Sequence, residues 1–423
     1  MGWSNRDMTS PHPAPAAGAA PTPIAYDHVI VGGGMVADAA ARGIRERDAD
    51  ATIAIISDDI DEPYTRPALS KKLWTDPDFT WDDVPLCTAD DTGAVVVLRT
   101  RVTALRPDAH ELDTDAGDTY SYGTVLIATG GTPVALPIEG GGASDRVLTF
   151  RTAEDYRHLR ALAAQADRIA VVGGGYIGSE LAAALVQQGV DTVLVHSTPT
   201  LGADVFPADL ADHFAGMFRD AGVELVRGHE VVGGVAGDAG VRLDLEGGAT
   251  VVADAVVSGL GIEVQTDLAE SAGIATGDGI VVDAHLRTDR AGVFAAGDVA
   301  EYPDRILGRR RVEHVDNAEQ MGRQAGRNLA GAGEEYTHTP YYYSVVFGTR
   351  YEAVGTLDGS LETVEDWVEP LERGVVYYLD DDRVVGVLLW NIDDRTDAAR
   401  AILAEDGPVD RDALIGRIRE EAS

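Results

Sequence analysis

The sequence predicts an α/β protein in which one strand–turn–helix–strand unit occurs twice and an α+β region follows at the C-terminus. The first unit, within 26–73, has a buried apolar strand, three successive glycines, a helix with small residues on one face, and a second strand. The second unit, at 168–196, repeats this order with a complete GxGxxG. Short apolar strands and then two helical segments, at 396–404 and 411–421, occupy 336–423. Two such units in one chain predict two Rossmann-like dinucleotide-binding domains.

The first unit has the residues that a dinucleotide needs. Gly32, Gly33 and Gly34 follow the strand at 27–31, and glycines let the backbone approach a pyrophosphate at a helix N-terminus. Asp58 follows the second strand, where a carboxylate binds the adenosine ribose hydroxyls. Ala37 stands in the place of the third glycine, and its small side chain still permits close helix–strand packing.

Composition excludes several classes of function. The chain has 423 residues and a formal net charge of −37, which argues against nucleic acid or an anionic membrane as partner. Its one cysteine, Cys87, excludes an internal disulfide, a CxxC redox pair and a cysteine-rich metal site. We expect no bound metal.

The N-terminal residues 1–23 are rich in Pro, Ala and Gly and lack a basic segment followed by an apolar core. We therefore expect a disordered tail rather than a signal peptide. No later stretch has the length and apolar purity of a membrane span. These features predict a soluble cytoplasmic protein.

A proline-containing segment at 63–74 follows the first unit and carries Arg66 and Lys71, which in this context can reach a dinucleotide pyrophosphate or a flavin ring. Short strands then predict a β-meander at 95–98, 102–105, 111–114 and 119–122. The strand starting at Thr124 ends in an ATGG turn that includes Thr129 and Gly130. Small residues at that turn allow the backbone to lie against a ligand.

The second unit begins with a strand at 168–172, and its turn contains Gly173, Gly174, Gly175, Tyr176, Ile177 and Gly178. A pair of dinucleotide sites indicates a flavin together with a nicotinamide. The last strand of the unit ends in His196-Ser197-Thr198, which has neither an acid for the 2′-hydroxyl of NAD nor an arginine for the phosphate of NADP. The choice between NADH and NADPH therefore stays open.

A third segment, 286–299, is a strand that ends in Gly297-Asp298. An acid at such a strand end can accept hydrogen bonds from the ribityl hydroxyls of a flavin. A helix predicted at 315–329 starts near this site, so the first domain is expected to be discontinuous. The predicted domains are FAD-binding at 24–149 and 278–334, NAD(P)H-binding at 150–277, and an α+β C-terminal interface domain at 335–423.

The segments VVGGGYIGSELA, PYTRPALSKKLW, IATGGTP, VFAAGDVA and GRRRVEHVDNA together resemble the two-dinucleotide flavoprotein reductases of the pyridine nucleotide-disulfide type. The similarity is greatest to the apoptosis-inducing-factor branch, beside the ferredoxin, rubredoxin and monodehydroascorbate reductases. It extends from Ala25 almost to the C-terminus.

The resemblance implies a set of site residues. Those implied to bind FAD are Gly32, Gly33, Gly34, Met35, Val36, Asp58, Arg66, Lys71, Val102, Thr129, Gly130, Arg151, Gly297, Asp298 and Tyr343. Those implied to hold or face the nicotinamide dinucleotide are Gly174, Gly175, Tyr176, Ile177, Gly178, Glu180, Gly261, Glu313, His314 and Val315. Lys71 paired with Glu180 at the flavin N5 edge, and His314 against the flavin, are the implied catalytic groups.

Two departures from the family pattern change what the resemblance implies. Tyr342-Tyr343 stands where the family has an aromatic pair that includes a tryptophan. The segment between Leu361 and Val375 is short, whereas the animal proteins carry a long regulatory insertion there. A role in animal cell death is therefore not expected, and the redox core is.

The resulting hypothesis is an FAD-dependent NAD(P)H oxidoreductase. Hydride passes from the nicotinamide to flavin N5, and electrons leave to a ferredoxin or rubredoxin, a quinone or a small acceptor. The alternative is a redox sensor whose NADH-dependent charge-transfer complex controls dimerisation or partner binding. Arg305, Arg309, Arg310 and Arg311 form a basic island that either docks an acidic carrier protein or makes internal or homodimer salt bridges.

Overall fold

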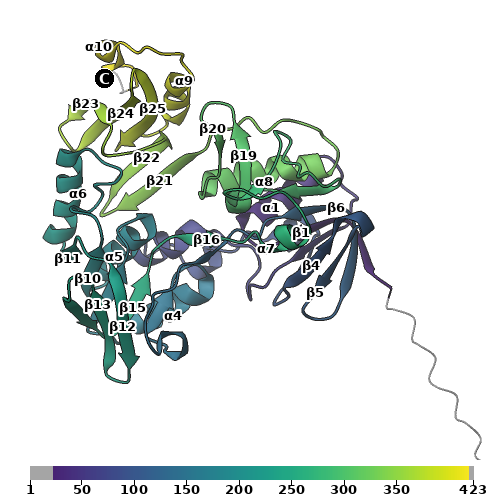
Figure 1. Ribbon diagram of the computed structural model, residues 1–423, viewed down its shortest axis with the longest axis horizontal. Helices are drawn as coiled ribbons and strands as arrows, with labels where there is room; N and C mark the ends of the chain where they lie inside the picture. The colour runs from purple at the N-terminus through teal and green to yellow at the C-terminus, as the bar shows by residue number, and fades with distance from the viewer. Residues whose placement is uncertain (1–21, 419–423) are drawn as a thin grey trace, which may run out of the picture.

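The computed structural model describes residues 22–418 as three sheet-based lobes, shown in Figure 1, and the second lobe is inserted between two parts of the first. Most of the predicted N-terminal tail lies outside the described residues. Within 22–418 no helix has the length and apolar character needed to cross a membrane.

The first lobe is built on a seven-stranded sheet in the order β3-β2-β1-β6-β5-β4, with β18 also paired to β6. Its strands are β1 Ile24–Val31, β2 Ile53–Ile56, β3 Val95–Val97, β4 Val102–Arg106, β5 Glu111–Thr114, β6 Thr119–Ile127 and β18 Val293–Ala295. Strands β3, β2, β1, β6 and β18 are parallel, and β4, β5 and β6 form an antiparallel meander. Strand β18 returns to this sheet after the whole second lobe.

The meander predicted from the sequence is partly wrong. Strand β3 belongs to the parallel half of the sheet, where it pairs with β2. The strands predicted at 119–122 and from Thr124 are one continuous strand, β6. It is long because its first half pairs with β5 while its whole length pairs with β1.

Helices α1 (Met35–Arg45) and α8 (Val315–Leu329) pack backbone to backbone against each other. A Cβ atom on Gly326 would lie 2.0 Å from the carbonyl oxygen of Ala40, and one on Gly43 would lie 2.2 Å from that of Arg323. Only glycine fits such a contact. This packing also places Gly322, in the middle of α8, against Val36 in the first turn of α1, just after the first glycine turn.

The second lobe is a five-stranded, fully parallel sheet in the order β11-β10-β9-β15-β8. Its strands are β8 Val147–Thr149, β9 Arg168–Val172, β10 Asp191–His196, β11 Glu224–Arg227 and β15 Ala255–Ser258. Its helices are α4 Ala153–Ala163, α5 Tyr176–Gln187 and α6 Ala208–Asp220. An antiparallel sheet of β12 Val231–Gly237, β13 Gly240–Leu245 and β14 Thr250–Ala253 completes it.

The chain enters and leaves the second lobe through one two-stranded connection. Strand β7 (Gly131–Pro133) leads out of the first lobe and pairs antiparallel with β16 (Ile262–Val264), which leads back. The domain limits given above remain predictions.

The third lobe is an antiparallel sheet in the order β21-β22-β25-β24-β23. Its elements are β21 Tyr341–Val346, β22 Thr349–Gly355, β23 Glu362–Glu369, β24 Arg373–Asp380, β25 Arg383–Trp390, α9 Thr396–Leu403 and α10 Arg411–Leu414. The helix predicted at 411–421 is too long, because α10 ends at Leu414 and Gly416 has φ +83°. The last residues of that prediction lie outside the described range.

The remaining elements are short and lie between the three lobes or at their edges. They are α2 Lys72–Thr75, α3 Thr88–Thr92, α7 Asp267–Ser271, β17 Ile280–Val281, β19 Ala300–Asp304 and β20 Gly308–Arg310. The 3₁₀ turns are η1 Arg66–Leu69, η2 Trp81–Asp83, η3 Pro107–Ala109, η4 Gly141–Ala143 and η5 Gly297–Val299. The proline-containing segment after the first unit folds into η1 and then the short helix α2.

Candidate cofactor and active site

The first glycine turn is held against its neighbouring strands so closely that side chains are excluded. Gly32 has φ +110°, and a Cβ there would lie 2.3 Å from the carbonyl oxygen of Ala128. A Cβ on Gly33 would lie 2.3 Å from Ser57 Oγ. Gly34 is the N-cap of α1, and no side chain of residues 22–418 caps that helix, which leaves its first N–H groups available to an anion. Met35 and Val36 form the first turn of the helix.

Two guanidinium groups and one carboxylate surround this helix start. Arg66 lies 3.9 Å from the place of a Cβ on Gly34, and its Nη1 donates to the carbonyl oxygen of Arg151 at 2.8 Å. Arg151 Nη2 in turn donates to Asp298 Oδ2 at 2.8 Å. A Cβ on Gly130 would lie 3.2 Å from Arg151 Nη2. The structure thus brings together residues that are up to 264 positions apart in the sequence.

The other predicted FAD residues lie at the ends of the same strands. Asp58 follows β2, is exposed and pairs with Arg101 Nη2 at 3.1 Å. Val102 is the next residue and starts β4. Thr129 donates from Oγ1 to the carbonyl oxygen of Gln265 at 2.9 Å, so its hydroxyl ties the turn to the returning chain.

These observations fit FAD. The uncapped helix start suits a pyrophosphate, and the two guanidinium groups beside it supply positive charge. The glycines form a cradle that Cβ atoms would fill. Asp298 and Asp58 supply acceptors for hydroxyl groups at its two ends.

The second glycine turn has the same design. Gly173 has φ +115°, and a Cβ there would meet the carbonyl oxygen of Gly259 at 2.4 Å. A Cβ on Gly178 would lie 1.8 Å from the carbonyl oxygen of Gly173, so α5 packs directly on the turn. Apart from Gly175 itself and its chain neighbours, no described residue has an atom within 4 Å of the Cβ position of Gly175, which faces open space.

A pocket of about 510 Å³ opens at this turn. Gly174, Gly175, Tyr176 and Gly261 line it, together with the end of β10. Ile177, also predicted to hold the nucleotide, has an exposed side chain on the first turn of α5. The pocket fits the nicotinamide dinucleotide predicted for this unit.

An ion pair joins the first and second lobes. Lys71 Nζ lies 2.8 Å from Glu180 Oε2, and the two side chains are 14% and 1% exposed. Ser70 Oγ donates to the same oxygen at 2.6 Å, and Ser344 Oγ, from β21 of the third lobe, donates to Oε1 at 2.6 Å. Glu180 is therefore the point at which all three lobes meet, and its charge is compensated by three donors.

His314 and Tyr343 lie beside this ion pair. His314 is the N-cap of α8, and its Nε2 lies 3.2 Å from the backbone N–H of Tyr343. Burial, with the charge of Lys71 as the next cause, lowers the pKa of His314 to about 4. The imidazole is therefore neutral at pH 7. The Tyr343 ring lies 5.3 Å from Lys71 Nζ and 4.9 Å from Arg350 Cζ.

The basic island is largely engaged in internal contacts. Arg305 pairs with Glu335 at 2.6 Å, and Arg309 donates to two backbone carbonyl oxygens. Arg311 pairs with Glu313 at 2.5 Å and also donates to the backbone carbonyl of Asp298. These contacts favour the internal salt-bridge interpretation over a docking surface. Val315 follows at the first position of α8.

Sequence reasoning missed several groups at this site. They are Ser70 and Ser344 on Glu180, Arg101 on Asp58, and Arg350 over Tyr343. Serines are common, and no local pattern marks a serine whose partner is more than a hundred residues away. Arg101 directly precedes the predicted Val102, so the missing information was that the segment between β3 and β4 lies against the loop after β2, where Thr100 N–H donates to the carbonyl oxygen of Ser57.

We expect His314 to make the protein less stable as the pH falls from 6.5 towards 4. Its folded-state pKa lies below the ordinary 6.5, so the unfolded chain binds a proton that the folded chain does not. The contribution of neutral His314 to the free energy of unfolding is fully present above pH 6.5. It is lost as the pH falls towards 4, by up to about 3 kcal/mol at 1.36 kcal/mol per pH unit. Urea unfolding at pH 7 and pH 5 should show a smaller difference for His314→Gln than for wild type. The control His158→Gln is a substitution on α4. If it reduced the difference in stability between pH 7 and pH 5 as much as His314→Gln does, this role of His314 would be contradicted.

An uncapped helix start flanked by cations, a second glycine-turn pocket and an ion pair between them define a flavin- and nicotinamide-dependent oxidoreductase. Residues 26–322 match the family described as Pyridine nucleotide-disulphide oxidoreductase, and residues 365–405 match Apoptosis-inducing factor, mitochondrion-associated, C-term. The chain belongs to the pyridine nucleotide-disulphide oxidoreductase family. The predicted fold class, enzyme class and cofactors, FAD with NADH or NADPH, are confirmed.

The similar proteins include both ferredoxin reductases and apoptosis-inducing factors, the two groups that the sequence resembles. The chain is 33% identical over 396 residues to the 5,5'-dehydrodivanillate O-demethylase ferredoxin reductase subunit of Sphingobium sp., covering 92% of this chain and 96% of that protein. It is 29% identical over 472 residues to the putative apoptosis-inducing factor 1, mitochondrial, of Drosophila melanogaster, covering 90% of this chain and 64% of that protein. The solved covalent putidaredoxin reductase–putidaredoxin complex has TM-score 0.84 and 26% identity, covering 92% and 95% of the two chains.

Proposed function

We propose that this chain moves electrons from NAD(P)H through FAD to a ferredoxin-type carrier protein. The observation that supports it most is the contact between Lys71 and Glu180. Glu180 lies on the helix that follows the second glycine turn, and Lys71 follows the first unit. A nucleotide in each unit would therefore have its reactive end directed at this ion pair.

Each group of residues has a distinct part in this proposal. The uncapped start of α1 binds the FAD pyrophosphate, with Arg66 and Arg151 as neighbouring cations. Asp298 accepts from the ribityl chain, and the pocket at Gly175 holds the nicotinamide dinucleotide. When bound, the two cofactors supply the redox chemistry itself.

The residues at the junction act by position and charge. Glu180 fixes the Lys71 ammonium, which would stabilise negative charge that develops on the reduced flavin. His314 is neutral at pH 7 and would face the flavin without adding a second positive charge. In the proposed reaction none of these residues has to act as a general base.

The carrier is inferred from the relatives. The Sphingobium relative is named as a ferredoxin reductase subunit, and the structurally similar reductase was solved as a complex with putidaredoxin. Anaerobic stopped-flow mixing tests the proposal: the protein is first reduced with NADH or NADPH and then mixed with a ferredoxin or with a quinone. Rapid reoxidation by the ferredoxin supports it, and reoxidation by the quinone alone would contradict it.

A redox-sensing function is the second candidate, and the match of residues 365–405 to the apoptosis-inducing-factor C-terminal family favours it. In that case the reduced protein should reoxidise slowly and change oligomeric state when NADH is added. Size-exclusion chromatography with light scattering, with and without NADH, measures the second property. The homodimer and the cytoplasmic location predicted from the sequence remain part of the proposal.

A further inference from the structure

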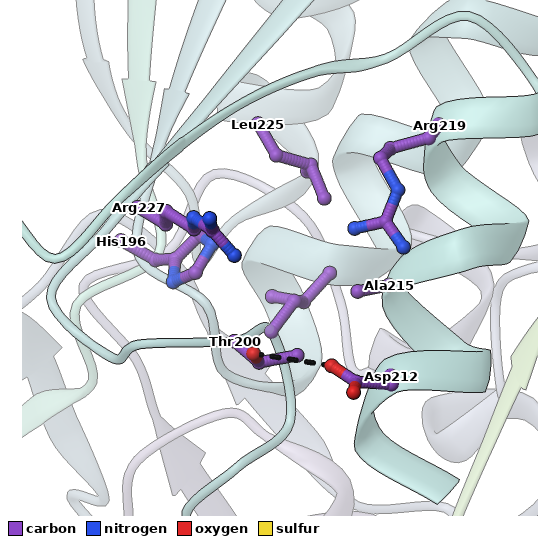
Figure 2. Close-up of a pocket in the computed structure, with 8 residues that line it drawn as sticks. His196, Thr200, Asp212, Ala215, Arg219, Leu225 and Arg227 are labelled. Atoms are coloured by element: carbon purple, nitrogen blue, oxygen red, sulfur yellow. Dashed lines mark hydrogen bonds between the residues drawn. The ribbon is translucent and has the colours of Figure 1, made fainter. Parts of the chain in front are cut away.

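A second pocket, of about 490 Å³, lies beside the end of β10 and adjoins the glycine-turn pocket. Figure 2 shows two guanidinium groups at this pocket, Arg219 from α6 and Arg227 from the end of β11. Both side chains are exposed, and among residues 22–418 neither makes a hydrogen bond or an ion pair. Two unpaired cations in one pocket are unexpected in a chain of net charge −37.

His196 forms the wall between the two pockets and lines both. It is only 3% exposed and lies opposite Arg227 in the parallel pairing of β10 with β11. Thr198 Oγ1 donates to the carbonyl oxygen of Thr200 at 2.9 Å, so it accepts from His196 Nδ1 at 2.9 Å. The proton is thus on Nδ1, and the buried Nε2 has no hydrogen-bond partner within the described part of the chain.

We infer that this pocket receives the 2′-phosphate of NADPH, bound by Arg219, Arg227 and His196 Nε2. The inference rests on the proposed function and specifies which nicotinamide nucleotide the second unit takes. His196 stands about 20 residues after the glycine turn, where an acid accepts the 2′-hydroxyl of NAD and an arginine accommodates the phosphate of NADP. The strand end itself carries no acid, although the exposed Asp204 lies close enough to interact electrostatically with His196.

The chemistry of the three groups matches a phosphate monoester. A guanidinium group presents a planar fork of donors that suits phosphate oxygens. The second pKa of a phosphate monoester is about 6, so at pH 7 the group is mainly a dianion, and its charge would favour a second proton on the imidazole that Nε2 donates to a phosphate oxygen. Two carboxylates oppose binding. Asp204 lines the adjoining glycine-turn pocket near His196. Asp212 lies across the phosphate pocket and accepts from Thr200 Oγ1 at 3.3 Å.

The structure also indicates why NADH fits this site less well. A ribose hydroxyl could donate to His196 Nε2, but it would leave both guanidinium groups without a partner. A phosphate satisfies all three groups at once. The proposal therefore differs from the NAD(+) named for a ferredoxin reductase relative of Burkholderia cepacia, which is 32% identical to this chain.

The test compares NADPH with NADH on the FAD-loaded protein. We expect kcat/KM for flavin reduction to be higher with NADPH than with NADH. The double variant Arg219→Ala/Arg227→Ala should lower the ratio of the two kcat/KM values by about tenfold or more, which corresponds to a loss of about 1.4 kcal/mol of binding free energy for the phosphate. Both side chains are exposed, so folding should be preserved. The charge-matched control Arg47→Ala/Arg383→Ala changes two exposed arginines elsewhere and should leave the ratio unchanged. Asp212→Asn should raise it.

Binding of 2′,5′-ADP and 5′-AMP, measured by calorimetry, separates this inference from the proposed function. If wild type binds 2′,5′-ADP more tightly than 5′-AMP and the Arg219/Arg227 double variant does not, the phosphate site is supported, whether or not flavin reduction is seen. Absence of flavin reduction by either nucleotide would overturn the proposed function and not the phosphate site. Equal binding of the two nucleotides by wild type would overturn the phosphate site. An unchanged NADPH-to-NADH ratio in the double variant would overturn it as well.

Discussion

Replacing Glu180 with Leu is expected to lower the free energy of unfolding by about 3–5 kcal/mol, the cost of breaking a buried ion pair on one side. The Lys71 ammonium, 14% exposed, would lose its counter-charge. The hydroxyls of Ser70 and Ser344 would lose their acceptor at the same time. Chemical denaturation, followed by tryptophan fluorescence, measures the loss. Because the three donors come from two lobes, their relative positions should also loosen.

The double variant Lys71→Met/Glu180→Leu serves as the matched control. An apolar pair of similar volume often replaces a buried ion pair at little cost, so the double variant should be more stable than Glu180→Leu alone. A loss below about 1 kcal/mol in the single variant, the level of an exposed salt bridge, would contradict the role assigned to Glu180. So would a double variant no more stable than the single one.

Replacing Lys71 with Met is expected to slow flavin reduction by NAD(P)H by about 10²–10³-fold, the effect of removing one aligned group that stabilises developing charge. The ammonium is held within 2.8 Å of Glu180 and 5.3 Å from the centre of the Tyr343 ring, so its position is fixed. Anaerobic stopped-flow absorbance gives the rate per bound flavin, which separates this effect from any loss of FAD.

Lys71→Arg controls for charge in the same experiment. It keeps a cation opposite Glu180 and should recover most of the rate that Lys71→Met loses. If Lys71→Met reduces its flavin as fast as wild type at the same FAD content, the ammonium has no part in charge stabilisation. If Lys71→Arg is as slow as Lys71→Met, geometry rather than charge decides the rate.

Local geometry explains why the two nucleotide units could be predicted from the sequence. The glycine positions follow from contacts within a few residues or with the adjacent strand: the Cβ position of Gly178 meets the carbonyl of Gly173, and that of Gly33 meets Ser57. Ala37 is fully buried, consistent with the requirement for a small residue there. Such contacts constrain residue types in a short window, and the spacing makes them visible.

The junction could not be derived in the same way. Lys71 and Glu180 are 109 positions apart, and only the resemblance to a known family suggested the pair. Ser344 is 164 positions from Glu180 and was missed. Local alternation of apolar residues also does not distinguish parallel from antiparallel pairing, so β3 was wrongly assigned to the meander.

The most direct test of the central claim is an anaerobic titration of the purified chain, following the visible absorbance of bound flavin. If the first unit holds FAD and the second directs a nicotinamide at it, the protein carries stoichiometric FAD. Added NADH or NADPH should then bleach that FAD completely. A chain that takes up no FAD, or that keeps its bound FAD oxidised when excess NADH or NADPH is added, would contradict the claim.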